Sequence, residues 1–180
     1  REAVEAAVLP LLTNESQGAD LAHDSLYAAA ITELVESGVI SGFADGQIGA
    51  AQPATRAQFA KMLALTLGIA DEELVLTPFT DLDPIDEHLY PHKYVAALYS
   101  AGAIAGVSAD SFSPWTPVTR AQMVTMLVRA LRAYSPEVLA APAQGLLPMT
   151  GVISPDHTDS MAVAEASGLL HGIVDYGEDW

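Results

Sequence analysis

Residues 54–58 read ATRAQ and residues 118–122 read VTRAQ, and each run opens a segment in which apolar residues recur at helical spacing. When the chain is shifted by 64 residues, the surroundings of the two runs align without a gap. Gly38 and Gly42 fall on Gly102 and Gly106, and Ile48 falls on Phe112. An ordered series of matches at one period is the signature of a duplicated structural unit. We therefore expect two copies of one unit.

Each copy is expected to consist of a helix, a loop and a second helix. In the first helix apolar residues recur at helical spacing, and Gly38 or Gly102 follows as a terminator in the left-handed conformation. The loop is rich in Gly, Asp, Ser and Pro, which supply the backbone dihedrals of turns, and Gly42 falls on Gly106. The second helix begins at TRAQ. The sequence thus predicts an all-α fold.

The start of each second helix carries a capping signal. Thr stands at the expected N-cap and Gln follows three residues later, which is the spacing of a capping box. Such a cap typically contributes about 1 kcal/mol to helix stability. The capping residues are Thr55, Gln58, Thr119 and Gln122. A capping box places no requirement on the two residues between Thr and Gln. The arginines at positions 56 and 120 therefore need another explanation.

Charge limits the partners of this chain. It has 180 residues with 51% hydrophobic residues, so it is long and apolar enough to fold around a core. Twenty-three Asp and Glu oppose seven Lys and Arg, which gives a net charge of -16. This charge repels nucleic acid and anionic lipid, and the apolar runs are too short for membrane insertion. An anion must instead find a local pocket where a cationic side chain is held in place.

Catalytic and metal chemistry is not expected. The chain has no cysteine, which excludes thiolate metal sites and cysteine nucleophiles. Residues 81–92 hold several Asp, Glu and His side chains, but their spacing matches neither an EF-hand nor a zinc-protease motif. A solvated acidic turn is the expectation there. No phosphate loop, dinucleotide fingerprint or nucleophile elbow is present, so neither a cofactor nor an enzyme is predicted.

The two copies resemble the S-layer homology repeat of bacterial surface proteins. The family pattern runs from F-x-D through G-[IV]-[IV]-x-G and a D-G-x-F-x-P loop to I-T-R-A-E. Matching runs are GVISGFADG at 38–46, FTD at 79–81, GAIAG at 102–106 and DSFSP at 110–114, beside the two TRAQ runs. The resemblance covers residues 20–69 and 79–134. Both copies depart from the pattern by Gln in place of Glu, and Ala50 replaces the loop proline of the first copy.

Such repeats usually come in threes, which implies a pseudo-threefold bundle of three units. Gly168 and Gly172 have the spacing of Gly38 and Gly42, which suggests that residues 156–180 are the leading half of a further repeat. Residues 1–13 would supply its trailing helix, and residues 135–155 a connection. The alternative is that the two terminal segments are ordinary helices that cap the stack.

The resemblance implies a non-catalytic module that holds proteins on the outside of the bacterial cell wall. Its ligand would be a secondary cell-wall polysaccharide, often carrying pyruvate ketals, bound in grooves between repeats with the motif arginine at the centre. A carboxylate suits a guanidinium fork, and amides at a helix start favour an anion. Arg56 and Arg120 are therefore the first candidates for ligand binding, and Arg1 is the third. The alternative is that these arginines brace the fold.

The loops supply further ligand candidates, which are Gly42, Phe43, Asp45, Asp81, Gly106, Asp110 and Trp115. The glycines have an alternative role, because they adopt backbone dihedrals that other residues resist. Phe43 and Trp115 could stack on sugar rings or pack between repeats. A second hypothesis also stays open, in which the drifted module has lost glycan binding and contacts copies of itself or another surface-layer protein.

Overall fold

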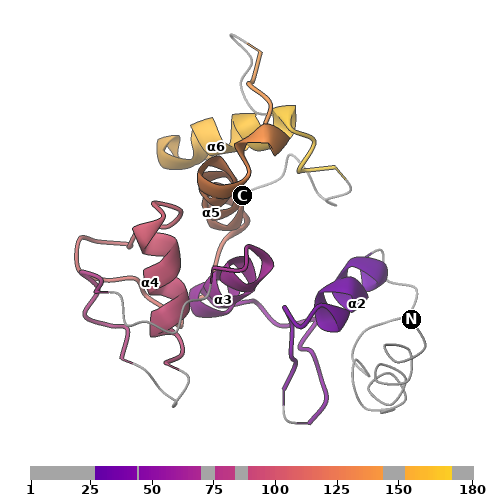
Figure 1. The fold of residues 1–180 in the computed structure, drawn as a ribbon, viewed down its shortest axis with the longest axis vertical. Helices are drawn as coiled ribbons and strands as arrows, with labels where there is room; N and C mark the ends of the chain where they lie inside the picture. Colours follow the sequence, from indigo (N-terminus) through magenta and orange to yellow (C-terminus); the bar gives the residue numbers. More distant parts are fainter. Residues whose placement is uncertain (1–26, 44, 70–75, 84–88, 144–152, 172–180) are drawn as a thin grey trace. The chain divides into compact units, whose positions relative to one another are not determined.

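The computed structural model describes residues 27–43, 45–69, 76–83, 89–143 and 153–171 (Figure 1). Over these ranges the chain forms five α-helices and one short 3-10 helix, and no strand. An isolated antiparallel bridge joins Thr55 to Pro117. The helices are α2 Ala28–Glu36, α3 Arg56–Thr66, α4 His92–Ser100, α5 Arg120–Tyr134 and α6 Pro155–Ala166, with the 3-10 helix η1 at Pro136–Val138. The predicted all-α class is confirmed.

The chain divides into two compact units, residues 1–53 and residues 54–180. The division falls between the two helices of the first repeat, so α2 belongs to the first unit and α3 to the second. Residues 1–13, and Arg1 with them, lie outside the described residues. The repeat boundaries, the split repeat and the pseudo-threefold packing therefore stay predictions.

The first helix of each repeat ends as its sequence indicates. Gly38 follows α2 with φ of 74°, and Gly102 follows α4 with φ of 68°. Both values lie in the left-handed region, which glycine adopts without steric cost. The amide of Val39 then donates to the carbonyl of Leu34 at 2.9 Å, which satisfies one of the last carbonyls of α2. Local sequence thus fixes where these helices end.

The second helices begin with complete capping boxes. In α3 the hydroxyl of Thr55 accepts a 3.2 Å hydrogen bond from the Gln58 amide, and the Gln58 side chain accepts one of 2.8 Å from the Thr55 amide. In α5, Thr119 and Gln122 make the same reciprocal pair, with both bonds at 3.2 Å. The paired contacts satisfy amides that a helix start would otherwise leave without partners.

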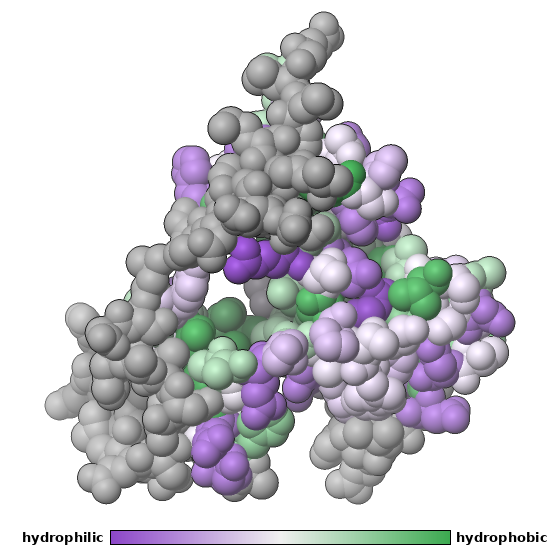
Figure 2. All heavy atoms as spheres, turned by 180° about the vertical axis from the view of Figure 1, so that it is seen from behind, coloured by the Kyte–Doolittle hydropathy of each residue, from purple (hydrophilic) through white to green (hydrophobic). Residues whose placement is uncertain are grey.

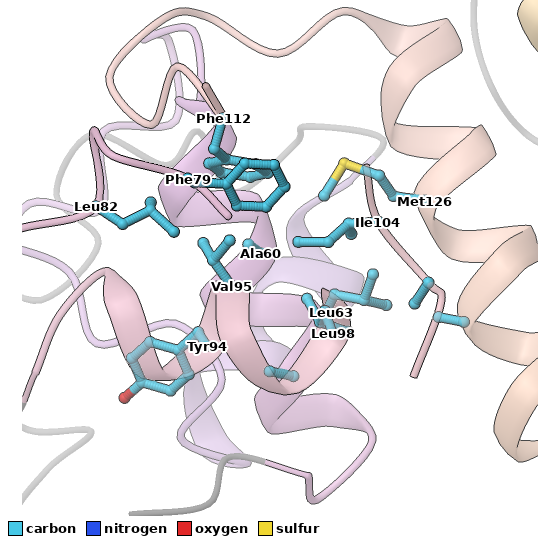
Figure 3. Close-up of a cluster of buried hydrophobic side chains, with 13 residues drawn as sticks. Ala60, Leu63, Phe79, Leu82, Tyr94, Val95, Leu98, Ile104, Phe112 and Met126 are labelled. Atoms are coloured by element: carbon cyan, nitrogen blue, oxygen red, sulfur yellow. The ribbon is translucent and has the colours of Figure 1, made fainter. Parts of the chain in front are cut away.

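Packing joins the second helix of the first repeat to the first helix of the second repeat. Helix α3 packs against α4, and α5 packs against α6. The larger buried cluster lies around α3 and α4 (Figure 3). Its members are Ala60, Leu63, Ala64, Phe79, Leu82, Tyr94, Val95, Leu98, Ala103, Ile104, Phe112, Met126 and Ala130. Because the cluster draws on both repeats, neither repeat forms this core without the other.

Helix α5 also contributes to a second buried cluster. Val124 and Val128 pack there with residues of α6 and the turn that follows it, which are Met161, Val163, Ala164 and Leu170. Two polar contacts cross the same interface. The Thr125 hydroxyl lies 2.8 Å from Nδ1 of His157, and Arg132 forms a 2.7 Å ion pair with Asp159. Helix α5 therefore links the two cores of residues 54–180.

Candidate functional site

The arginine of the first TRAQ run is buried against the loop of the second repeat. Arg56 is 5% exposed, and its Nε donates a 2.8 Å hydrogen bond to the carbonyl of Phe112. A terminal guanidinium nitrogen donates at 3.2 Å to the carbonyl of Ala105, and the guanidinium lies 4.5 Å from the centroid of the Phe112 ring. Burial lowers the pKa of Arg56, while the nearby Asp81 charge opposes that shift. This geometry favours the bracing role over direct ligand contact.

The Asp81 carboxylate binds backbone amides of the same loop. It accepts hydrogen bonds from the Phe112 amide at 2.9 Å, the Ser113 amide at 2.8 Å and the Ser111 hydroxyl at 2.7 Å. Burial raises the pKa of Asp81, and the hydrogen bonds to its ionised form lower it. The combined lowering is the larger effect, so the pKa of Asp81 lies below its usual value. Arg56 and Asp81 thus bind the carbonyls and the amides of one loop.

The start of α3 is closed by backbone contacts. The Arg56 amide donates to the carbonyl of Thr116, and the Ala57 amide donates to the carbonyl of Pro114, both at 2.9 Å. The next amide, that of Gln58, is bonded to the capping threonine. The first three amides of α3 therefore have protein partners. These amides therefore do not bind an anion at the start of α3, where the sequence had suggested that helix-start amides would assist ligand binding.

The loop glycines serve different physical needs. A Cβ on Gly106 would lie 2.4 Å from the carbonyl oxygens of Ser108 and Ser111 and 2.6 Å from the Phe79 ring, so the space there admits no side chain. Gly42 has φ of 65°, and a Cβ would lie 2.8 Å from the carbonyl oxygen of Gln47. Both observations support the backbone role that the sequence left as the alternative.

The other loop candidates are exposed. In residues 1–53, Phe43 is 46% exposed, and the Asp45 carboxylate accepts a 3.1 Å hydrogen bond from the Gln47 amide. In residues 54–180, the Asp110 carboxylate accepts a 2.8 Å bond from the Ser108 hydroxyl. Arg120, the first residue of α5, is exposed, unlike its counterpart Arg56. The two motif arginines therefore have different environments.

Sequence reasoning missed a surface that surrounds Trp115. The Trp115 ring is 51% exposed and lies edge-on to the Tyr90 ring, with centroids 5.8 Å apart. Tyr90 in turn contacts Tyr94, and the ammonium groups of Lys61 and Lys93 lie over these tyrosine rings. No sequence signal joined these residues, because they come from α3, α4 and two loops. On one face of the molecule, hydrophobic residues appear in small groups among hydrophilic ones (Figure 2).

The sequence profile of the S-layer homology domain matches residues 22–60 and 78–124. Both repeats belong to the S-layer homology family. The matched ranges contain α2, the start of α3, α4 and the start of α5, with the loops between them. The S-layer homology repeats thus include the Arg56 brace, Asp81, Gly106 and Trp115.

Proteins similar to this chain include S-layer proteins and an endoglucanase of Bacillus species. An S-layer protein of Bacillus licheniformis is 33% identical over 56% of this chain and 11% of its own length. The S-layer protein EA1 of Bacillus anthracis is 31% identical over the same shares. An endoglucanase of Bacillus sp. (strain KSM-635) is 29% identical over 91% of this chain, but the match covers 17% of that enzyme. The chain thus spans less than a fifth of each relative.

The family and these relatives indicate the cellular location and the general role of the repeats. S-layer homology repeats are non-catalytic modules of cell-wall anchoring, and this module lies at the bacterial cell surface. Where the structure describes the chain, none of the helices is both long and apolar enough to cross a bilayer.

Proposed function

We propose that this module holds its parent protein on the cell envelope by binding an anionic secondary cell-wall polysaccharide. The polymer would carry carboxylates on its sugars, of which pyruvate ketals are one form, and grooves between repeats would receive it. Family membership supports the anchoring role. The acidic composition sets the physical requirement, because a chain of net charge -16 needs a local cationic group to capture an anion.

Exposure of Arg120 is the observation that carries this proposal. Arg56 and Arg120 occupy the same position of the duplicated motif. Arg56 is buried and donates hydrogen bonds to loop carbonyls, whereas Arg120 is exposed. A guanidinium fork at a helix start matches the two oxygens of a carboxylate and benefits from the helix dipole. The ligand role that the sequence assigned to both arginines is thus assigned first to Arg120.

Loop residues of the first repeat would contribute sugar contacts. Phe43 presents an exposed aromatic ring, and Asp45 presents an exposed carboxylate that can accept hydrogen bonds from sugar hydroxyls. Gly42 shapes the turn before them, and in the second repeat Asp110, one position after the counterpart of Asp45, presents an exposed carboxylate. Arg1 stays a candidate outside the described residues. These assignments are proposals about single residues and can be tested one by one.

Sedimentation with cell-wall sacculi tests the proposal. Sacculi that retain their non-peptidoglycan polymer should bring down the chain, and sacculi stripped of that polymer should not. Arg120→Gln should weaken the binding at least about tenfold, since a hydrogen bond to a charged group contributes about 1.5–3 kcal/mol. Arg129→Gln removes one charge from the same helix and is the matched control. Equal binding to stripped and intact sacculi would contradict the proposal.

A second candidate function is contact with other surface-layer proteins or with copies of the same chain. The observation in its favour is the exposure of hydrophobic side chains, among them Leu76 at 88% and Val107 at 54%. Sedimentation velocity over a range of protein concentrations distinguishes the two functions. Reversible association without any binding to sacculi would favour the second candidate.

A further inference from the structure

We infer that Lys61, Tyr90, Lys93, Tyr94 and Trp115 form a second binding site for a carboxylate-bearing sugar, distinct from Arg120. These five residues are called the lysine-aromatic surface. The inference rests on the proposed function, because it names the chemical class of a polymer residue and the side chains that would receive it.

Three aromatic rings form the base of this surface. Tyr94 is 8% exposed and lies at the edge of the larger core, with its hydroxyl oxygen pointing away from the cluster (Figure 3). The Tyr90 ring stands edge-on to Tyr94 at 6.2 Å and to Trp115 at 5.8 Å. The core thus fixes Tyr94, Tyr94 and Tyr90 contact each other, and Trp115 extends the row to an indole that is 51% exposed. An exposed indole at the end of such a row can stack on the apolar face of a sugar.

Both lysines of the chain lie on this row. The Lys93 ammonium is 5.1 Å from the centroid of Tyr94, and the Lys61 ammonium is 5.8 Å from Tyr90 and 6.0 Å from Tyr94. Helix α3 supplies Lys61 and helix α4 supplies Lys93, and these helices pack against each other. Residues that are 32 positions apart in the sequence are therefore held beside one aromatic cluster by the core.

Within the described part of the chain, the two ammonium groups contact aromatic rings. Among the described residues, neither lysine is within ion-pair distance of a carboxylate, although Asp and Glu outnumber Lys and Arg by 23 to 7. Among the described residues their printed contacts are with π-faces, which accept no conventional hydrogen bond from an ammonium group. A carboxylate that meets both groups would accept such bonds. Charge complementarity therefore points to an anionic occupant, and the exposed indole points to a sugar.

Fluorescence of Trp115 can report directly on this surface. The chain has two tryptophans, so Trp180→Phe leaves Trp115 as the reporter. The probe is the polymer released from sacculi, used in its native form and with its carboxylates amidated. Native polymer should change the emission of Trp115 in a saturable manner, whereas amidated polymer should leave it unchanged. Lys61→Gln combined with Lys93→Gln should weaken binding about tenfold or more. Lys61→Arg, which keeps the charge at position 61, should retain most of the binding.

The controls separate this inference from the proposed function. Arg129→Gln removes a charge outside the surface and should bind like the wild type. Thermal unfolding confirms that each variant is folded. If the unaltered chain binds neither intact sacculi nor released polymer, the proposed function and the inference both fail. If it binds both, but the double lysine variant and Trp115→Ala bind as tightly and Trp115 emission does not respond, the inference is overturned and the proposed function stands.

Discussion

The guanidinium of Arg56 lies 4.5 Å from the centroid of the Phe112 ring, and its Nε donates a 2.8 Å hydrogen bond to the carbonyl of the same residue. One side chain thus contacts both the ring and the backbone of a residue 56 positions away. The contact ties the second helix of one repeat to the loop of the next. In this copy of the motif, the arginine stabilises the association of the two repeats.

Arg56→Lys should reduce the free energy of unfolding by about 2–3 kcal/mol. Lysine keeps the charge but lacks the planar fork, so it cannot reach both loop carbonyls and lie over the ring. Urea denaturation followed by circular dichroism measures the change. Arg120→Lys, at the exposed counterpart position, should change the free energy by less than about 0.5 kcal/mol. Equal effects at the two positions would contradict the different environments of the arginines.

Asp81→Asn should destabilise the chain by about 1–3 kcal/mol at pH 7, because the carboxylate accepts three hydrogen bonds that one amide oxygen cannot replace. Folding lowers the pKa of Asp81, so its contribution is present above the unfolded pKa and is lost as the pH falls through the folded one. Urea titrations between pH 7 and pH 3 should show that the free energy of unfolding falls less on acidification in the variant than in the wild type. Parallel curves for the two proteins would argue against this role.

Much of the fold could be predicted because its signals are local. Helix ends at Gly38 and Gly102, and the caps at Thr55 and Thr119, depend on residues within five positions of each other. These features follow from capping and periodicity, which act within one or two helical turns.

The site was harder to predict because its contacts are distant in sequence. The pattern TRAQ is the same in both copies, yet the environment of its arginine depends on the loop that packs over it. Arg56 meets carbonyls 49 and 56 residues away. The gathering of Lys61 and Lys93 likewise depends on how α3 packs against α4. Single-sequence patterns contain no record of such packing, so the lysine-aromatic surface could not be anticipated.

Gly106→Ala should destabilise the chain by about 2–3 kcal/mol, because its Cβ would lie 2.4 Å from two backbone oxygens that cannot move aside cheaply. Gly38→Ala is the matched comparison. A Cβ there meets nothing within 4 Å, and the cost of about 1–2 kcal/mol arises from φ of 74°. Thermal unfolding of both variants compares the two costs. A Gly106 variant as stable as the wild type would mean that the loop is packed more loosely than described.

Acidification below neutral pH should weaken the interface between α5 and α6. Burial lowers the pKa of His157, Asp156 opposes this shift and Arg129 adds to it. The unfolded chain therefore binds the proton more readily, and stability falls as the pH drops below about 6.5. His157→Gln keeps a polar partner for Thr125 but does not titrate. Urea denaturation at pH 7.5 and 5.5 should show a smaller loss in this variant, and an equal loss would count against the effect.

Anchoring by wall polymer is tested most directly by sedimenting the intact chain with sacculi before and after removal of the non-peptidoglycan polymer. The expected result is binding to the intact sacculi, its disappearance after removal, and at least about tenfold weaker binding for Arg120→Gln than for Arg129→Gln. Undiminished binding to stripped sacculi, or none to intact sacculi, would contradict the account.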